Sequence, residues 1–293
     1  MYIELHAASA FSFLEGASLP EALVDRAADL GYPALGLLDR DGLYGVPRFH
    51  KAAVAAGVNP IVGSEITIKM QGANHRASVP SSVSNFWQLP VLIETREGYK
   101  NLTRLITKMK LRAPKGKGAL ELDELEGHTA GLVALIGRPA VMGCYYGVGG
   151  LLDRLLGVFG RTQVYVELQR HLLREEEHDN QALLAMASAY RVPVVATNGV
   201  RFAEFSDRPM YDVLTCIRHK TTLDRIGQRL HRNAERYLKP PAMMEKLFWD
   251  LPDAIKTTHE LANRLGYTMV DLGYRFPDYP VPPEETMDSF LQK

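Results

Sequence analysis

The sequence predicts an α/β protein, and among α/β folds it favours a seven-stranded (β/α) barrel. Seven short apolar runs, rich in β-branched residues, recur along the chain, and amphipathic helical patterns separate most of them. Strands that helices cover on both faces are nearly all apolar, which indicates parallel pairing. An open doubly wound sheet is the structural alternative, but seven successive strand–helix units favour closure.

The predicted strands are short and share an apolar composition. They lie at residues 2–6, 34–38, 60–68, 90–95, 131–136, 164–168 and 193–197. The first strand ends in a histidine, His6, at the point where a barrel strand meets its loop. A polar side chain at this position makes the strand ends candidates for a functional site.

The predicted helices between the strands begin and end at residues typical of helix termini. Residues 19–30 follow Ser18 as N-cap, carry Pro20 in the first turn and stop at Gly31. Further helical patterns lie at residues 46–56, 98–110, 151–159 and 175–190.

Beyond the last predicted strand the pattern changes to helices alone, at residues 208–219, 242–249 and 253–265. In residues 274–285, prolines enforce an extended conformation typical of a linker. We therefore divide the chain into a barrel at residues 1–221 and, at residues 222–293, a helical extension that ends in this Pro-rich passage.

The composition is that of a globular protein. Of 293 residues, 46% are hydrophobic and 23% are charged, and the 34 basic side chains equal the 34 acidic ones. A neutral total gives no global field to attract nucleic acid, so any such contact depends on a local patch. Cys144 and Cys216 lie far apart, and no signal peptide or membrane span is visible. We therefore predict a cytoplasmic protein with no membrane partner.

A polar set stands at the ends of the predicted strands, where the loops of a (β/α) barrel converge and its chemistry takes place. The set comprises His6, Asp39, Arg40, Asp41, Glu65, Gln88, Glu94, Arg138, Glu167, His171, Asn198, Gly199 and Arg201. Their convergence on one end of the barrel depends on the barrel prediction.

This set is a poor match for a polynuclear metal centre, which needs several imidazoles, bridging carboxylates and no uncompensated cation. A guanidinium is permanently charged and only donates hydrogen bonds, so it cannot ligate a metal. We therefore expect Arg40 and Arg201 to neutralise Asp39 and Glu65 through charge-assisted hydrogen bonds, leaving an inert pocket.

Simpler structural interpretations compete with a functional site. His6 alone is typical of a hydrogen-bonded structural histidine, and Asp41 followed by Gly42 is typical of a turn. His171 lies among charged residues typical of a solvated helix start. Glu65 differs from these, because an acid inside an apolar strand needs a partner wherever it points.

Several stretches, in order along the chain, resemble one family. They read ELHAASAFSFLEGAS at residues 4–18, DRDGLYG at 39–45, NPIVGSE at 59–65, EGYKNL at 97–102, VATNGVR at 195–201, NAERYLK at 233–239 and FPDYP at 276–280. The chain resembles the N-terminal polymerase and histidinol phosphatase (PHP) domain of bacterial C-family DNA polymerases, the DNA polymerase III alpha subunits. More narrowly, it resembles their error-prone branch, over essentially its whole length.

The resemblance implies a distorted, TIM-like barrel of seven strands, which in metal-bearing relatives holds a trinuclear centre for phosphoesterase or 3′–5′ exonuclease activity. His6, Asp39, Glu65 and His171 match ligand positions of that centre. Other ligand positions are substituted, at Ala8, Arg40, Gln88, Gly199 and Arg201. Such losses should abolish tight metal binding. We therefore predict no metal cofactor and no catalytic residue here, and zinc or manganese belongs to the alternative of an active site.

The resemblance also implies a place in a DNA-directed DNA polymerase, a nucleotidyltransferase of DNA replication, repair and translesion synthesis. In family members the acidic polymerase triad lies beyond the region that this chain matches. The expected function is a non-catalytic scaffold or interaction domain. Its expected partners are a polymerase core in the same or a companion chain, DNA, and mutasome or replisome proteins. The alternatives are an active metal-dependent phosphoesterase or exonuclease and a free-standing interaction protein.

Overall fold

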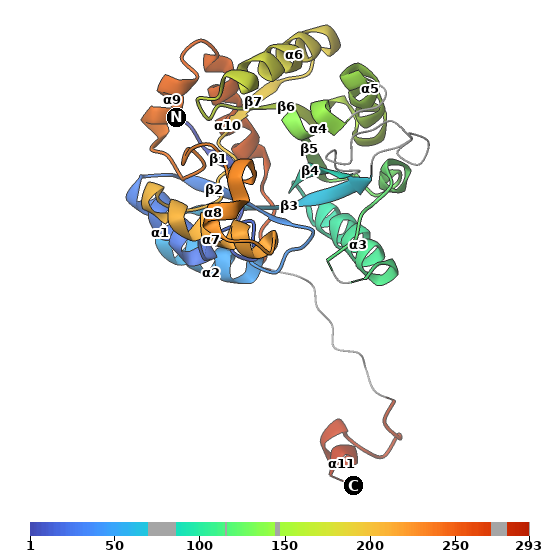
Figure 1. Cartoon of the computed structure of the whole chain (residues 1–293). Helices are drawn as coiled ribbons and strands as arrows, with labels where there is room; N and C mark the ends of the chain where they lie inside the picture. The colour runs from blue at the N-terminus through green and yellow to red at the C-terminus, as the bar shows by residue number, and fades with distance from the viewer. Residues whose placement is uncertain (70–85, 115, 144–146, 271–279, 293) are drawn as a thin grey trace.

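The computed structural model describes residues 1–69, 86–114, 116–143, 147–270 and 280–292. Cys144 and residues 274–279 of the predicted Pro-rich passage lie outside these residues. The strands form one seven-stranded sheet, and helices surround it, as Figure 1 shows. The predicted α/β class is therefore confirmed.

The strands follow one another around the sheet in sequence order. They are β1 (Glu4–Ala7), β2 (Ala34–Arg40), β3 (Asn59–Lys69), β4 (Phe86–Ile93), β5 (Leu132–Ile136), β6 (Val164–Gln169) and β7 (Val194–Thr197). The edges meet just after β7, where the N–H of Val200 donates to the carbonyl of His6 and the N–H of Ala8 donates to that of Val200, both at 2.9 Å. The sheet is a nearly closed, TIM-like barrel, so the doubly wound alternative is wrong.

Strand β4 departs from the predicted parallel pairing. It runs antiparallel to β3 and β5, whereas the other neighbours pair in parallel. Parallel neighbours need a crossover, usually a helix, and the sequence shows no helical pattern between β3 and β4. The start of β4, with Gln88, therefore lies at the carboxyl ends of the parallel strands. We call this end of the barrel the mouth.

The helices connect the strands and continue after β7. They are α1 (Pro20–Asp29), α2 (Val46–Ala56), α3 (Arg96–Arg112), α4 (Arg138–Gly143), α5 (Gly147–Phe159), α6 (Arg174–Tyr190), α7 (Arg208–Arg218), α8 (Leu223–Ile226), α9 (Pro241–Leu247), α10 (Pro252–Arg264) and α11 (Met287–Leu291). The predicted helices are confirmed to within a few residues at each end. None of the helices within the described ranges combines the length and apolar character that crossing a bilayer requires.

The termini of the first two helices follow their sequence signals in part. Helix α2 ends at Gly57, whose φ of 71° is the left-handed conformation that glycine favours. Helix α1 begins with Pro20, but its N-cap residue is Leu19. Ser18 is not the cap, because its hydroxyl accepts a hydrogen bond from the backbone N–H of Ala203 at 2.8 Å. The hydroxyl ties the loop after β1 to the segment after β7.

Helix α10 closes the end of the barrel opposite the mouth. Leu261 and Ala262 of α10, with Leu265 just after it, pack on the apolar side chains inside the barrel. The partners are Ile3, Leu5, Ala34, Leu38, Ile61, Leu92, Val133, Leu135 and Val195. The backbone N–H of Ile3 also donates to the Thr258 hydroxyl at 3.0 Å. The helical extension therefore completes the barrel core.

Shortening Leu261 should destabilise the whole barrel. Its side chain is 1% exposed, so Leu261→Ala leaves a cavity between α10 and the strands. We expect the free energy of unfolding to fall by about 2–5 kcal/mol, measured by chemical denaturation. The control is Leu111→Ala on α3, whose side chain is 84% exposed and whose loss should change stability by less than about 0.5 kcal/mol. Equal, small effects of both variants would contradict the packing of α10 on the barrel core.

Candidate functional site

His6 lies at the mouth between two buried carboxylates. Its Nδ1 is 2.6 Å from Glu167 Oε1, and its Nε2 is 2.7 Å from Glu65 Oε1. An ionised carboxylate only accepts hydrogen bonds, so both ring nitrogens carry a proton and the ring is a cation. Burial lowers the pKa of His6, but the charges and hydrogen bonds of Glu167 and Glu65 outweigh it and raise this pKa to about 10.

Arg201 binds the second of these carboxylates as well. Its guanidinium donates to Glu65 Oε1 at 2.7 Å and to Oε2 at 3.2 Å, which confirms the predicted Arg201–Glu65 pair. Burial opposes the charge of Glu65, but Arg201 and His6 together hold the pKa of Glu65 well below its ordinary value. The order Glu167–His6–Glu65–Arg201 thus alternates negative and positive charge, and we call these four residues the charge chain.

Two acids in this region did not stand out in the sequence as partners of His6. Glu167 accepts a further hydrogen bond at Oε1, from the hydroxyl of Thr197 at 2.5 Å. Glu4 accepts from the hydroxyl of Tyr2 at 2.6 Å and from the backbone N–H of His6 at 2.9 Å. The available signal was the one used for Glu65, an acid inside an apolar strand, and it applies equally to Glu4 and Glu167.

Asp39 and Arg40 do not pair, contrary to the prediction. Asp39 accepts hydrogen bonds from the backbone N–H of Ser9 at 2.8 Å and from the hydroxyls of Ser9 and Ser12, each at 2.9 Å. Arg40 forms its ion pair with Glu15 instead. Adjacent residues of a strand point to opposite faces, so the Arg40 side chain turns away from Asp39. Burial raises the pKa of Asp39.

The interpretation of Asp41 as a turn residue agrees with the structure. Its φ of 51° is left-handed, and its carboxylate accepts from the backbone N–H of Thr67 at 2.7 Å and from the Thr67 hydroxyl at 2.8 Å. Asp41 therefore fixes the turn after β2 onto β3.

His171 is buried, so its interpretation as part of a solvated helix start is wrong. The residue is only 1% exposed. Its Nδ1 lies 2.7 Å from Glu176 Oε1, and its Nε2 lies 2.8 Å from the carbonyl of Asn198. These contacts hold His171 to α6 and to the turn after β7. None of the contacts described for it reaches the charge chain.

The remaining positions of the predicted set differ in where they lie. Ala8 is buried and bonds through its backbone, Gln88 is half-buried opposite Thr67, and Gly199 has a φ of 55° at the mouth. Glu94 was expected at the mouth but lies at the α10 end, 2.8 Å from Arg264. The reason is the reversed direction of β4, which places its carboxyl end at the opposite end from those of the parallel strands.

The donor set at the mouth does not fit a divalent metal ion. A ligating histidine must offer an unprotonated nitrogen, and both nitrogens of His6 are engaged as donors. Both oxygens of Glu65 accept hydrogen bonds from the guanidinium of Arg201. A guanidinium keeps its charge at any ordinary pH, so deprotonation cannot free these oxygens for a metal ion. Over the described ranges, no three His, Cys, Asp or Glu side chains are grouped so as to hold a metal.

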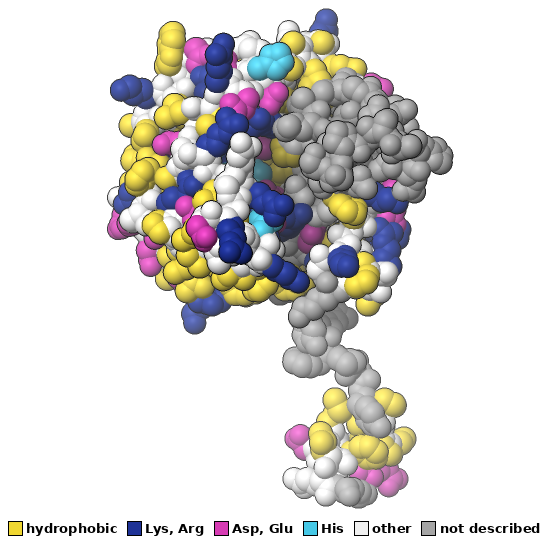
Figure 2. Space-filling view, viewed as in Figure 1, with side chains coloured by type: hydrophobic (Ala, Val, Ile, Leu, Met, Phe, Trp, Pro, Cys, Tyr) yellow, Lys and Arg dark blue, Asp and Glu magenta, His cyan; other side chains and the backbone are white. Residues whose placement is uncertain are grey.

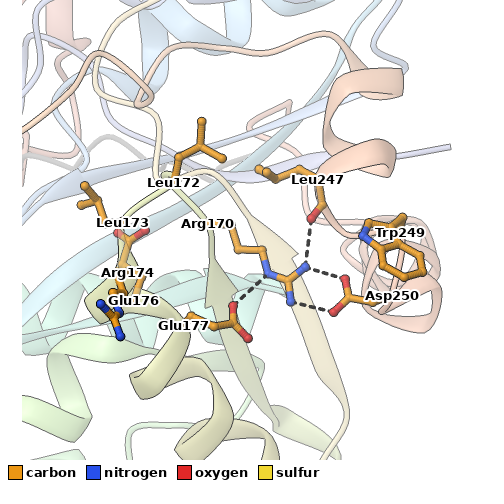
Figure 3. A pocket seen from close by; sticks show the side chains of 9 residues that line it. All are labelled: Arg170, Leu172, Leu173, Arg174, Glu176, Glu177, Leu247, Trp249 and Asp250. Carbon is orange, nitrogen blue, oxygen red and sulfur yellow. Dashed lines mark hydrogen bonds and ion pairs between the residues drawn. The ribbon is translucent and has the colours of Figure 1, made fainter.

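A separate pocket of about 510 Å³ lies between the start of α6 and the turn from α9 to α10. Figure 3 shows Arg170 at its centre, with its guanidinium on the carbonyl of Leu247 at 2.9 Å and on Asp250 at 2.5 and 2.9 Å. Glu177 lies 3.8 Å from the same guanidinium. The charge of Arg170 is therefore already paired, and its contacts tie the turn from α9 to α10 to the start of α6.

The comparisons with known proteins agree with the fold and the motifs. The family model of the PHP domain matches residues 4–171. The chain is 37% identical to an error-prone DNA polymerase of Anaeromyxobacter dehalogenans, over 96% of this chain and 24% of that protein. It is 35% identical to those of Rhodopseudomonas palustris, over 99% and 25%, and Mycolicibacterium paratuberculosis, over 100% and 27%. The chain thus spans about a quarter of the length of these relatives.

Solved structures resemble the chain more distantly. An amidohydrolase from Chromobacterium violaceum superposes with a TM-score of 0.47 and 15% sequence identity, over 69% of this chain and 88% of that one. The strand order and pairing described above carry the fold assignment on their own.

The protonation of His6 predicts a pH dependence of stability. The folded pKa of about 10 lies above the ordinary value of 6.5, so the stabilisation is complete below pH 6.5 and is lost as pH rises towards 10. Within this window the free energy of unfolding should fall by up to about 1.4 kcal/mol per pH unit. Chemical denaturation at several pH values between roughly 6 and 9 measures how steeply the free energy of unfolding falls with pH.

The variant His6→Gln should flatten this slope, since the titrating group is gone. The matched control is His259→Gln, which removes an exposed histidine whose contact is with Asn263 and should leave the slope as in the parent. Identical slopes for the parent and His6→Gln would show that the ring is not the proton binder.

Proposed function

Because the chain belongs to the PHP domain family, we propose that it is a metal-free, non-catalytic scaffold domain of an error-prone DNA polymerase. The relatives named error-prone DNA polymerase match it over nearly its whole length, and it spans about a quarter of theirs. Its principal partner is then a polymerase core in the same or a companion chain. DNA synthesis, including synthesis across damage, would be the activity of that larger assembly.

The observation that carries the proposal is the charge chain. A metal ion bound between His6 and Glu65 would have to remove the ring proton and displace the guanidinium of Arg201. The displaced guanidinium would be left buried without a partner, which is the most costly arrangement for a charge in a protein interior. Arginine at this position therefore supports a domain that keeps its shape without metal.

The same contacts argue against acid–base catalysis by these side chains. A general base for water needs a pKa near the working pH and a free acceptor atom. The pKa of Glu65 is held low by Arg201 and His6, and that of His6 is raised to about 10, so neither group exchanges protons readily near neutrality. The proposed role of the domain is therefore to support and position the polymerase core.

Metal content and nuclease activity test the proposal together. After incubation with Mn²⁺ or Zn²⁺ and removal of free ions, we expect well under one ion per chain by elemental analysis, because the ligand set is incomplete. Labelled single-stranded DNA should stay intact, with an active metal-dependent PHP phosphoesterase as the positive control.

The rival function gives a distinct result in the same assay. Nucleotide release that needs the metal, stops with a chelator and disappears in Glu65→Gln would establish an active phosphoesterase or exonuclease. Glu97→Gln on α3 removes an exposed carboxylate of the same type and serves as the matched control.

A free-standing interaction protein is distinguished at the level of the gene and its partners. The proposal expects the chain to occur joined to, or in a stable complex with, a polymerase core. A chain expressed alone in its cell, with no polymerase recovered on it after gentle crosslinking, would contradict the scaffold role.

A further inference from the structure

Helix α7 keeps an apolar face in contact with solvent. Met210, Val213 and Ile217 recur at helical spacing on this face, and these residues are 42–57% exposed. Leu214 belongs to the same face and is half-buried. Figure 2 shows hydrophobic side chains gathered along the lower edge of the barrel body, where Figure 1 places α7 with α1 and α2. We call these four residues the α7 stripe.

The opposite face of α7 is buried, so the helix is apolar on both sides. Tyr211 and Cys216 are buried there, and the centre of the Tyr211 ring lies 5.6 Å from that of Phe202. The hydroxyl of Thr215 donates to the carbonyl of Tyr211 at 2.9 Å, within the helix. A helix with apolar residues on every side is typical of a position that protein covers. The α7 stripe therefore indicates a contact surface for another molecule.

The charged side chains within α7 are paired inside the fold. Arg208 Nε donates to Asp212 Oδ1 at 2.7 Å. Arg218, at the other end of the helix, lies 3.0 Å from Glu15 in the loop after β1. The stripe between these pairs carries no charge of its own. Its helix is also held in place before any partner binds, which lowers the entropic cost of association.

Two further charges of opposite sign flank the stripe. Asp207 is the N-cap residue of α7, where it accepts a hydrogen bond from the Ser18 hydroxyl at 3.3 Å, and the exposed Lys220 lies just after the helix. Within the described ranges neither side chain forms an ion pair. Met210 and Ile217 lie equally far along the chain from the centre of the stripe. The same holds for Asp207 and Lys220, so the two halves of the pattern match except for the sign of the charge.

We propose that two copies of this chain form a two-fold dimer in which their α7 stripes pack antiparallel. In that arrangement each Met210 faces Ile217 of the partner subunit, and Val213 lies at the two-fold axis. Each Asp207 faces Lys220 of the partner subunit, so opposite charges meet at both ends while the apolar side chains leave water. A parallel arrangement would instead bring like charges together. This self-association goes beyond the proposed scaffold role.

The oligomeric state of the whole chain in solution tests the proposal. Sedimentation equilibrium from roughly 1 µM to 1 mM should show a monomer–dimer equilibrium and no larger species, because a two-fold contact closes on itself. Val213→Asp places two like charges at the axis and should raise the dissociation constant about tenfold or more. The matched control is Leu111→Asp at an exposed position of α3, which should dimerise as the parent does. Circular dichroism should show the parent's fold for both variants, since both side chains are exposed.

Charge exchange separates the antiparallel contact from non-specific apolar association. Lys220→Glu places a carboxylate opposite Asp207 and should weaken the dimer, and Lys220→Gln, which removes the charge without reversing it, should weaken it less. Adding Asp207→Lys to Lys220→Glu in the same chain re-forms both ion pairs in reverse and should restore the dimer. The two single variants at position 220 keep the test decisive if the double variant does not fold.

Several results would overturn the dimer. A chain that stays monomeric at the highest concentration would do so, as would a dimer unaffected by Val213→Asp, one lost in Leu111→Asp, or open-ended assembly. Protection of α7 from hydrogen exchange only in a complex with a polymerase core, without dimers, would assign the stripe to that core instead. These measurements do not depend on metal content, so failure of the dimer is distinguishable from failure of the metal-free scaffold.

Discussion

A buried alternation of charge, from Glu167 through His6 and Glu65 to Arg201, holds the barrel mouth together. It joins β6, β1, β3 and the turn after β7, which are distant in sequence. Burying each ion costs several kcal/mol, so the arrangement is favourable only while every member has its partner. The charges of two cations and two anions cancel, and the Thr197 hydroxyl donates a further hydrogen bond to Glu167. Each charge along this line is therefore compensated by a neighbour of opposite sign.

That balance also decides what chemistry is left to the mouth. A protonated ring and a doubly occupied carboxylate offer neither a metal ligand nor a base, which is why support rather than hydrolysis is the proposed role.

The sequence predicted most of the barrel because apolar strands and capped helices are local signals. It could not predict the direction of β4, because an apolar run looks the same in a parallel and an antiparallel strand, and Glu94 was misplaced as a result. The pairing of Glu65 with Arg201 followed from the cost of a buried acid. The partner of Arg40 did not, because charge type alone cannot tell which face of a strand a side chain occupies. Glu167 needed the three-dimensional meeting of β1 and β6.

The helical extension contacts both ends of the barrel. Helix α10 fills one end of the barrel with Leu261, and residues 233–239 lie across the mouth at the other end. The buried Lys239 reinforces this second attachment, since its Nζ lies 3.0 Å from Asn198 Oδ1. Asn198 also donates to the carbonyls of Glu235 and Tyr237, so loosening the extension would open the mouth as well as the core. The predicted division at residue 221 is therefore crossed by contacts on which both ends of the barrel depend.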